Sequence, residues 1–325
     1  MISTSEFTPM FPEVLPGVIS QNNNMGKLAE YISKIAVSDG TVFLHGETGT
    51  GKELFANAIH QLSDRPGRII SVNCGAIPEN LFESLFFGHE KGSFTGADKK
   101  QHGFFYQANH GTLFLDEIAE LPLVHQAKLL RVLESRQFSR IGSSETLEFT
   151  GRIISASHVN LEQRVEERLF REDLWYRLNL FEITIPALHQ RRDDIPLLAK
   201  YFARKTNRIR FMPCALKLMQ FSDWPGNIRQ LKNAVDKLAV LADGPEVTAE
   251  CIQQLAMCHA RVDWAARVAM EIIDMPITNK LKTIHDALIE QAVEISKGNK
   301  SEAARLLGVH RKVVERRLAQ IQTMR

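Results

Sequence analysis

Short apolar runs alternate with longer amphipathic stretches over the first part of the chain. Most of the runs lead into Gly, Asn, Asp or Ser, and helix-like stretches such as residues 126–136 lie between them. The runs are Val42-Phe43-Leu44, Ile69-Ile70-Ser71-Val72, Thr112-Leu113-Phe114-Leu115, Ile153-Ile154-Ser155-Ala156 and Phe181-Glu182-Ile183-Thr184-Ile185. This alternation predicts an α/β unit in which helices cover a mostly parallel sheet.

The pattern changes after Pro186, where the predicted strands stop and helical periodicity takes over. We therefore expect the α/β unit to span residues 17–187 and an all-α unit to span 188–258. Residues 259–278 are weakly patterned and are expected to be a linker, and a third, helical unit follows over 279–325. Residues 1–16 are expected to be an N-terminal extension, too short for a regulatory domain.

Composition and charge restrict the class of protein. The chain has 325 residues, with 40 Lys and Arg against 38 Asp and Glu, and 44% of its residues are hydrophobic. These values are ordinary for a globular protein and exclude wholesale disorder. No apolar stretch is long enough to span a bilayer and no secretory signal is visible, so we expect no membrane insertion. Four cysteines without C-x-x-C spacing indicate a reducing cytoplasm.

A glycine-rich loop between a predicted strand and a predicted helix is the sharpest motif. Its residues are Gly46, Glu47, Thr48, Gly49, Thr50, Gly51, Lys52 and Glu53. Glycines let backbone N–H groups approach phosphate oxygens, and the helix N-terminus adds the positive end of its dipole. Lys52 supplies a charge for the β- and γ-phosphates. Glu53 stands where Ser or Thr usually helps to hold Mg²⁺. The motif predicts ATP binding; the alternative is a strand-to-helix turn with a surface lysine.

Two carboxylates end the apolar run at 112–115. Asp116 is predicted to hold Mg²⁺ or its water shell, and Glu117 to polarise the attacking water as a general base. The alternative is a pair of solvated acids at the start of a helix, where negative charge is favoured. The phosphate loop earlier in the chain favours the catalytic interpretation.

At this point the sequence resembles a known family, the bacterial enhancer-binding proteins that activate sigma-54 RNA polymerase. The resemblance covers roughly residues 17–258. It rests on these motifs in order: G-E-T-G-T-G-K-E, V-N-C-G-A-I-P-E-N-L, F-G-H-E-K-G-S-F-T-G-A, G-T-L-F-L-D-E-I-A-E-L-P, Q-A-K-L-L-R-V-L-E, F-R-E-D-L-W-Y-R-L-N and W-P-G-N-I-R-Q-L-K-N. It implies an AAA+ P-loop ATPase with a parallel sheet, followed by a helical lid.

The resemblance also implies roles for four further residues. Asn73 matches the Asn that holds the catalytic Glu; capping a turn is the alternative. Arg171 and Arg177 match two arginine fingers, and on an ideal helix they point about 120° apart. One is then expected to contact the γ-phosphate and the other the subunit interface, so a neighbour completes the site. Arg229 matches the arginine that the lid points at nucleotide. The family's ring is usually a hexamer.

One loop distinguishes this family from other AAA+ machines, and we call residues 92–97 the contact loop. It consists of Gly92, Ser93, Phe94, Thr95, Gly96 and Ala97 and resembles the G-A-F-T-G-A loop that touches sigma-54. The alternative is an ordinary loop that folds Phe94 into the core. Ser93 replaces the usual Ala, and its hydroxyl is expected on an exposed loop. His158 replaces the Asn that senses γ-phosphate, so a sensing role depends on its tautomer.

The C-terminal end is basic and helical. From Lys297 to Arg325 it has eight basic residues and two acidic ones, which indicates a polyanion partner. Two short helices flank Gly308, and Asn299 has the spacing of a helix N-cap. This end resembles the Fis-type helix-turn-helix, whose DNA contacts would come from Lys300, His310, Arg311, Lys312, Arg316 and Arg317.

The leading hypothesis is a sigma-54-dependent transcriptional activator. It would hydrolyse ATP with Mg²⁺ as a ring oligomer, which the resemblance implies is a hexamer, and remodel the sigma-54 RNA polymerase holoenzyme while bound to enhancer DNA. We expect it in the bacterial cytoplasm, associated with the nucleoid, and controlled by expression or by a separate regulatory protein acting in trans. The alternatives are a nucleotide-gated DNA-binding regulator that does not drive sigma-54 and another AAA+ remodeller such as a replication loader.

Overall fold

The computed structural model describes residues 15–94, 97–242, 244–254 and 279–324. The chain divides into two compact units, Met1–Ala260 and Arg261–Arg325. The predicted linker, 259–278, lies outside the described residues. No helix of the described part is long and apolar enough to cross a membrane.

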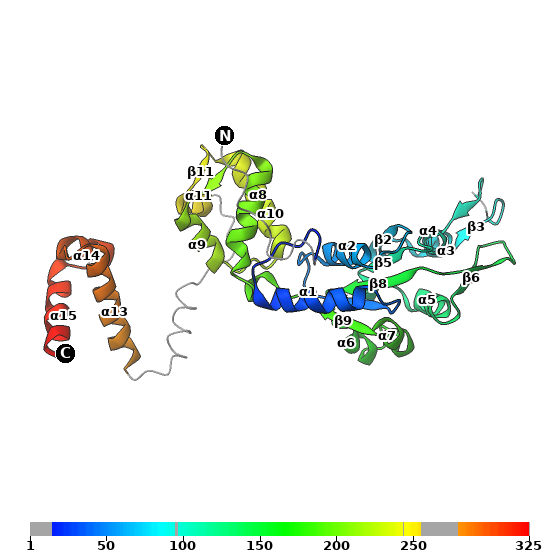
Figure 1. Ribbon diagram of the computed structural model, residues 1–325, viewed down its shortest axis with the longest axis horizontal. Coiled ribbons are helices and arrows are strands. Elements are labelled where there is room, and N and C mark those ends of the chain that lie inside the picture. The colour runs from blue at the N-terminus through cyan, green and yellow to red at the C-terminus, as the bar shows by residue number, and fades with distance from the viewer. Residues whose placement is uncertain (1–14, 95–96, 243, 255–278, 325) are drawn as a thin grey trace. The chain divides into compact units, whose positions relative to one another are not determined.

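A five-stranded sheet forms the centre of the first unit (Figure 1). Its strands are β1 (Val42–His45), β2 (Ile69–Asn73), β5 (Thr112–Asp116), β8 (Arg152–Ser157) and β9 (Phe181–Thr184). They run parallel in the order β2-β5-β8-β1-β9. All five predicted runs are strands of this sheet, and the predicted parallel sheet is confirmed.

Helices bury both faces of the sheet. They are α1 (Asn23–Ala36), α2 (Lys52–Leu62), α3 (Phe82–Phe87), α4 (Phe104–Gln107), α5 (Leu123–Ser135), α6 (Leu161–Glu166) and α7 (Glu172–Leu178). In β5, Leu113 and Leu115 join the core under α3, α4, α5 and α7, whereas Phe114 joins the core under α1 and α2. Because its alternate side chains enter opposite cores, β5 is a nearly continuous apolar run in the sequence.

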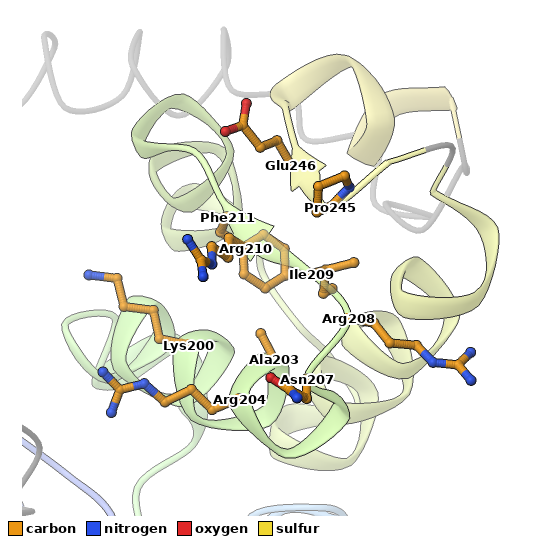
Figure 2. A pocket seen from close by; sticks show the side chains of 10 residues that line it. All are labelled: Lys200, Ala203, Arg204, Asn207, Arg208, Ile209, Arg210, Phe211, Pro245 and Glu246. Atoms are coloured by element: carbon orange, nitrogen blue, oxygen red, sulfur yellow. The ribbon is translucent and has the colours of Figure 1, made fainter. Parts of the chain in front are cut away.

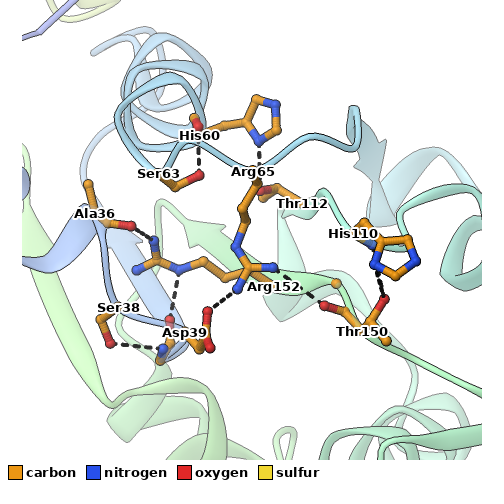
Figure 3. Close-up of polar contacts among 12 residues, drawn as sticks. Ala36, Ser38, Asp39, His60, Ser63, Arg65, His110, Thr112, Thr150 and Arg152 are labelled. Atoms are coloured by element: carbon orange, nitrogen blue, oxygen red, sulfur yellow. Dashed lines mark hydrogen bonds and ion pairs between the residues drawn. The ribbon is translucent and has the colours of Figure 1, made fainter.

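A buried arginine ties the first helix to the sheet (Figure 3). Arg152, at the start of β8, is 1% exposed and donates to the carbonyls of Ile35, Ala36 and Gly40. Burial lowers its pKa to about 10. The first two of these carbonyls belong to the last turn of α1, where carbonyls have no partner within the helix. Arg152 therefore satisfies a helix end that the core encloses.

Two small antiparallel hairpins that the sequence pattern did not predict extend from one end of the unit (Figure 1). One pairs β3 (Gly88–His89) with β4 (Gln101–His102), and the other pairs β6 (Gln137–Ser139) with β7 (Thr146–Glu148). The contact loop lies between β3 and β4. A β-bridge between His89 and Ile141 links the two hairpins.

The lid follows the sheet and is helical, as predicted. It contains α8 (Asp194–Thr206), α9 (Pro213–Phe221), α10 (Asn227–Leu241) and α11 (Ala249–Gln254) around one apolar core. It also has one feature that the helical pattern did not predict. The two-residue strands β10 (Arg210–Phe211) and β11 (Glu246–Val247) pair in parallel.

The second unit has three described helices, α13 (Lys280–Ile295), α14 (Lys300–Leu306) and α15 (Arg311–Met324). Ile289, Ala303 and Val314, one from each helix, are buried in its core. The side chain of Asn299 accepts hydrogen bonds from the N–H groups of Ser301 and Glu302, as the cap signal predicts.

Candidate nucleotide site and contact loop

The phosphate loop connects β1 to α2, so it lies at the carboxyl end of the parallel sheet, where ligands of such sheets bind. Gly49 and Gly51 have φ angles of 82° and 100°, which favour glycine. A Cβ on Gly49 would lie 2.4 Å from the carbonyl oxygen of Gly226 in the lid. The loop therefore needs glycine at position 49 both for its turn and for the close approach of the lid.

Lys52 is 9% exposed at the start of α2. Its Nζ donates to the carbonyls of Gly46 at 2.7 Å and Glu47 at 3.3 Å, so the ammonium lies inside the curve of the loop. Burial lowers its pKa, against the opposite effect of the Asp116 and Glu117 carboxylates. The charge is poised to move from backbone carbonyls to a stronger anionic partner such as a phosphate.

Asp116 and Glu117 lie at the carboxyl end of β5, close to Lys52. Burial raises the pKa of Asp116, and Lys52 opposes that rise. Glu117 has a φ of 53°, and its N–H donates to the Asp116 carboxylate at 3.0 Å. The sharp turn directs two successive side chains to different positions. The structure thus brings the two predicted acids and the predicted lysine together.

Asn73 ends β2 in register with Asp116. Its Oδ1 accepts a hydrogen bond from the N–H of Ala76, so it caps the short turn that follows β2. Asn73 Oδ1 and Glu117 Oε2 lie 3.5 and 3.2 Å from the position of a Cβ on Gly75, so both side chains face that glycine. The capping alternative is therefore observed, and a role in holding Glu117 stays a prediction.

The lid contacts the phosphate loop through residues near the start of α10. Asn227 Nδ2 donates to Glu47 Oε2 at 2.9 Å and to the Thr48 carbonyl at 3.1 Å. The N–H of Arg229 donates to the Gly49 carbonyl at 3.3 Å. Arg229 thus lies beside the loop, as the resemblance implies, but Asn227 was not assigned from the sequence. Its signal was its place in the W-P-G-N-I-R motif.

The two candidate arginine fingers occupy different kinds of position. Arg171 is the N-cap of α7 with extended backbone, whereas Arg177 lies in the last turn of that helix. The ideal-helix angle of about 120° therefore does not apply to this pair. The Arg171 guanidinium binds both carboxylate oxygens of Asp173, and Arg177 donates to the carbonyl of Leu133 at 3.1 Å. The finger roles stay predictions.

His158 directly follows β8 and is exposed. Since β8 lies between β5 and β1, His158 follows the carboxyl end of the sheet between the acids and the phosphate loop. That is a suitable place for a phosphate sensor, and the sensing role stays a prediction.

The contact loop is closed at its base by backbone hydrogen bonds, including one from Gly92 N–H to the Ala97 carbonyl at 2.8 Å. Phe94 is 42% exposed and contacts the ring of His89, so it does not lie in the core. Thr95 and Gly96 lie outside the described residues. The loop thus offers an accessible aromatic side chain close to its tip.

Ser93 differs from expectation. Its Oγ is buried and has no hydrogen-bond partner among the described residues, although the hydroxyl was expected to be exposed. The cause is Gly142 in the second hairpin, where an added Cβ would lie 2.6 Å from the Cβ of Ser93. The second hairpin therefore packs directly against the contact loop.

The predicted DNA-binding side chains fall into two groups. Exposed positions are held by Lys300, His310, Arg311, Lys312 and Arg316. Arg317 instead donates to Asp286 of α13 at 2.5 Å and is 22% exposed. That ion pair holds α15 against α13, and a DNA contact from Arg317 stays a prediction.

A separate cavity of about 930 Å³ lies within the lid (Figure 2). Ten residues line it, four of them basic: Lys200, Arg204, Arg208 and Arg210. In Figure 2 the Arg208 guanidinium points to the side opposite Lys200 and Arg204. The four basic groups therefore do not all face the same side, and the cavity shares no residue with the predicted nucleotide site.

Comparison with known proteins identifies three successive domains. Residues 18–184 match the sigma-54 interaction domain, residues 189–262 the AAA+ ATPase lid domain and residues 281–320 the Fis family of bacterial regulatory proteins. The first of these matches covers about half of the chain.

Curated relatives agree with these matches. The chain is 42% identical over 310 residues to the transcriptional regulatory protein ZraR of Salmonella typhimurium, covering 93% of this chain and 68% of that one. It is 48% identical over 234 residues to the DNA-binding transcriptional activator HyfR of Escherichia coli, covering 70% of this chain and 35% of that one.

Among solved structures, NtrX from Brucella abortus in complex with ATP aligns with a TM-score of 0.68 at 31% identity, covering 94% of this chain and 69% of that one. The AAA+ fold and the family resemblance are confirmed. The chain therefore belongs to the bacterial enhancer-binding proteins, the sigma-54-dependent transcription activators that join a sigma-54 interaction domain and an AAA+ lid to a Fis-type DNA-binding domain.

Proposed function

We propose that this chain hydrolyses ATP in a ring of subunits and uses the reaction to remodel sigma-54 RNA polymerase while its Fis-type unit holds enhancer DNA. The observation that carries the proposal is the meeting of Lys52, Asp116 and Glu117 under a lid that touches the same loop. The setting is the bacterial cytoplasm and its nucleoid, where polymerase and DNA are found.

Each residue of the site has one task. Backbone N–H groups of the phosphate loop and the ammonium of Lys52 bind the triphosphate. Glu117 orients the attacking water and accepts its proton. Asp116 suits a Mg²⁺ ion held mainly by phosphates and water, since a cation would offset the cost of burying this carboxylate. When bound, Mg²⁺ neutralises charge that develops on the phosphates.

Completion of the site by a neighbour would couple hydrolysis to the ring. Arg171 directly precedes α7 and Arg177 lies in that helix; we assign both to the contact with the adjacent subunit, one at its γ-phosphate and the other at the interface. Arg229 would move the lid when ATP is hydrolysed to ADP, because its N–H already donates a hydrogen bond to the phosphate loop. The contact loop would then carry Phe94 to and from the sigma subunit.

Promoter opening with purified sigma-54 polymerase tests the proposal, with and without ATP. Glu117→Gln is expected to bind ATP and to lose hydrolysis by about 100-fold or more, because it cannot accept the proton. Glu120→Gln, three residues away and exposed, is the matched control and should hydrolyse ATP normally.

The outcomes separate the candidate functions. Opening that needs ATP and an intact Glu117 supports the activator. Hydrolysis and DNA binding without opening would instead identify a nucleotide-gated DNA-binding regulator. Unchanged turnover in Glu117→Gln would remove this residue from the mechanism.

A further inference from the structure

A buried ion pair lies where the lid begins, outside the site described above. Arg191 and Asp194 are 1% and 0% exposed, and Arg191 Nη1 lies 3.9 Å from Asp194 Oδ2. Burying two charges is costly, and at 3.9 Å the two groups attract each other without sharing a hydrogen bond. The hydrogen bonds that each partner makes elsewhere must account for the arrangement.

Arg191 reaches the phosphate loop. Its Nη2 donates to the carbonyl of Thr50 at 3.2 Å, and its Nη1 contacts the sulfur of Met25 in α1 at 3.5 Å. Thr50 is 1% exposed and lies two residues before Lys52. A cation that fixes this carbonyl therefore fixes the part of the loop from which Lys52 starts.

The carboxylate of Asp194 contacts residues 15–22, which we call the strap. Its two carboxylate oxygens accept hydrogen bonds from Ser20 Oγ and from the Gln21 N–H, both at 2.7 Å. In the strap, Leu15 and Val18 belong to the core of the α/β part, whereas Ile19 packs against the core of the lid. The strap thus contacts both parts and the ion pair.

We propose that Arg191 is a positioning residue of the nucleotide site, and that the strap sets the affinity for ATP through Asp194 and Arg191. When Ser20 moves, Asp194 loses a hydrogen-bond donor and shifts. Arg191 then shifts with Asp194, and the Thr50 carbonyl loses its donor. None of the three side chains is among the residues predicted to bind the nucleotide. This inference rests on the proposed ATPase function, because it names what regulates that same site.

ATP binding and hydrolysis by the full chain test the relay. Ser20→Ala removes one donor to Asp194, and Arg191→Lys keeps the charge but loses the planar fork that spans two partners. Both are expected to raise the Kd and KM for ATP by about tenfold, as for loss of one hydrogen bond to a charged group, with kcat within about twofold of wild type. Ser33→Ala, which removes a hydrogen bond within α1, is the control and should change neither constant.

The result that overturns the inference is wild-type ATP affinity in both variants, even if their melting temperatures without nucleotide fall, because the network would then only support packing. If Arg191→Lys does not fold, Ser20→Ala alone decides. If wild-type protein binds ATP but does not hydrolyse it, while Ser20→Ala weakens binding, the proposed ATPase fails and the relay stands.

Discussion

Lys52 is buried and Asp116 is partly buried, and burial disfavours the charged form of each. Burial shifts the pKa of Lys52 downward and that of Asp116 upward, so each is pushed toward its neutral form. Each therefore gains from a ligand of opposite charge more than an exposed residue would. The sequence located both residues, but the degree of burial follows from the covering lid and helices.

His125 provides a prediction at the same scale. It is buried on α5 and stacks on Phe82 with ring centroids 4.0 Å apart. Burial lowers its pKa, outweighing the opposite effect of Glu79. The unfolded chain takes up this proton near pH ~6.5 whereas the folded chain resists it, so stability is expected to fall as pH drops through that value.

Urea unfolding at about pH 7.5 and about pH 5.5 measures this loss. His125→Phe keeps the stacked ring and removes the titration, so its loss of stability between the two pH values should be smaller than that of wild type. An equal loss in both proteins would show that other groups cause the pH dependence.

Secondary-structure elements show what periodicity can and cannot predict. All five strands of the main sheet were predictable from short apolar runs; β1, β5 and β8 are buried along nearly their whole length, whereas the edge strands β2 and β9 each have exposed residues. The strands β3, β4, β6, β7, β10 and β11 are two or three residues long and carry no such pattern. The contacts between the lid and the phosphate loop could not be predicted from periodicity either, since Asn227 and Glu47 are 180 residues apart in the sequence. The motifs predicted which loops carry functional residues, but which loops contact one another depends on tertiary packing.

The end of α1 depends on one guanidinium, which gives a second prediction. Arg152→Met would remove the donor to the carbonyls of Ile35, Ala36 and Gly40; Ile35 would keep the N–H of Ser38, but the buried Ala36 carbonyl would lose its guanidinium partner. We expect a loss of about 3 kcal/mol or more in the free energy of unfolding, measured by urea denaturation. Arg65→Met, at a partly exposed ion pair with Asp39, should cost less than about 1 kcal/mol. Similar losses in the two variants would contradict the capping role.

The contact loop gives a third prediction. Phe94→Ala is expected to leave ATP hydrolysis within about twofold of wild type and to reduce promoter opening by about tenfold or more, because an exposed aromatic contributes most to a contact with a partner. Phe221→Ala, at a 59% exposed aromatic in the lid, is the matched control. Full opening by Phe94→Ala would exclude Phe94 from the sigma contact.

The whole molecule is proposed to work only as part of a ring, and mixing tests this. Lys52→Ala cannot bind phosphate, whereas Arg177→Ala cannot complete a neighbour's site. Each alone is expected to be inactive. In an equal mixture, about a quarter of interfaces join an intact loop to an intact finger, so part of the hydrolysis should return. No recovery above the two separate proteins would mean that Arg177 does not act in trans.

The positive φ of Glu117 has a consequence for engineering. Any residue other than glycine is destabilised by about 1 kcal/mol or more in this backbone geometry. A laboratory that evolved the chain for heat resistance, with no check on turnover, would therefore tend to recover Glu117→Gly. The most thermostable variants would then be those that no longer hydrolyse ATP.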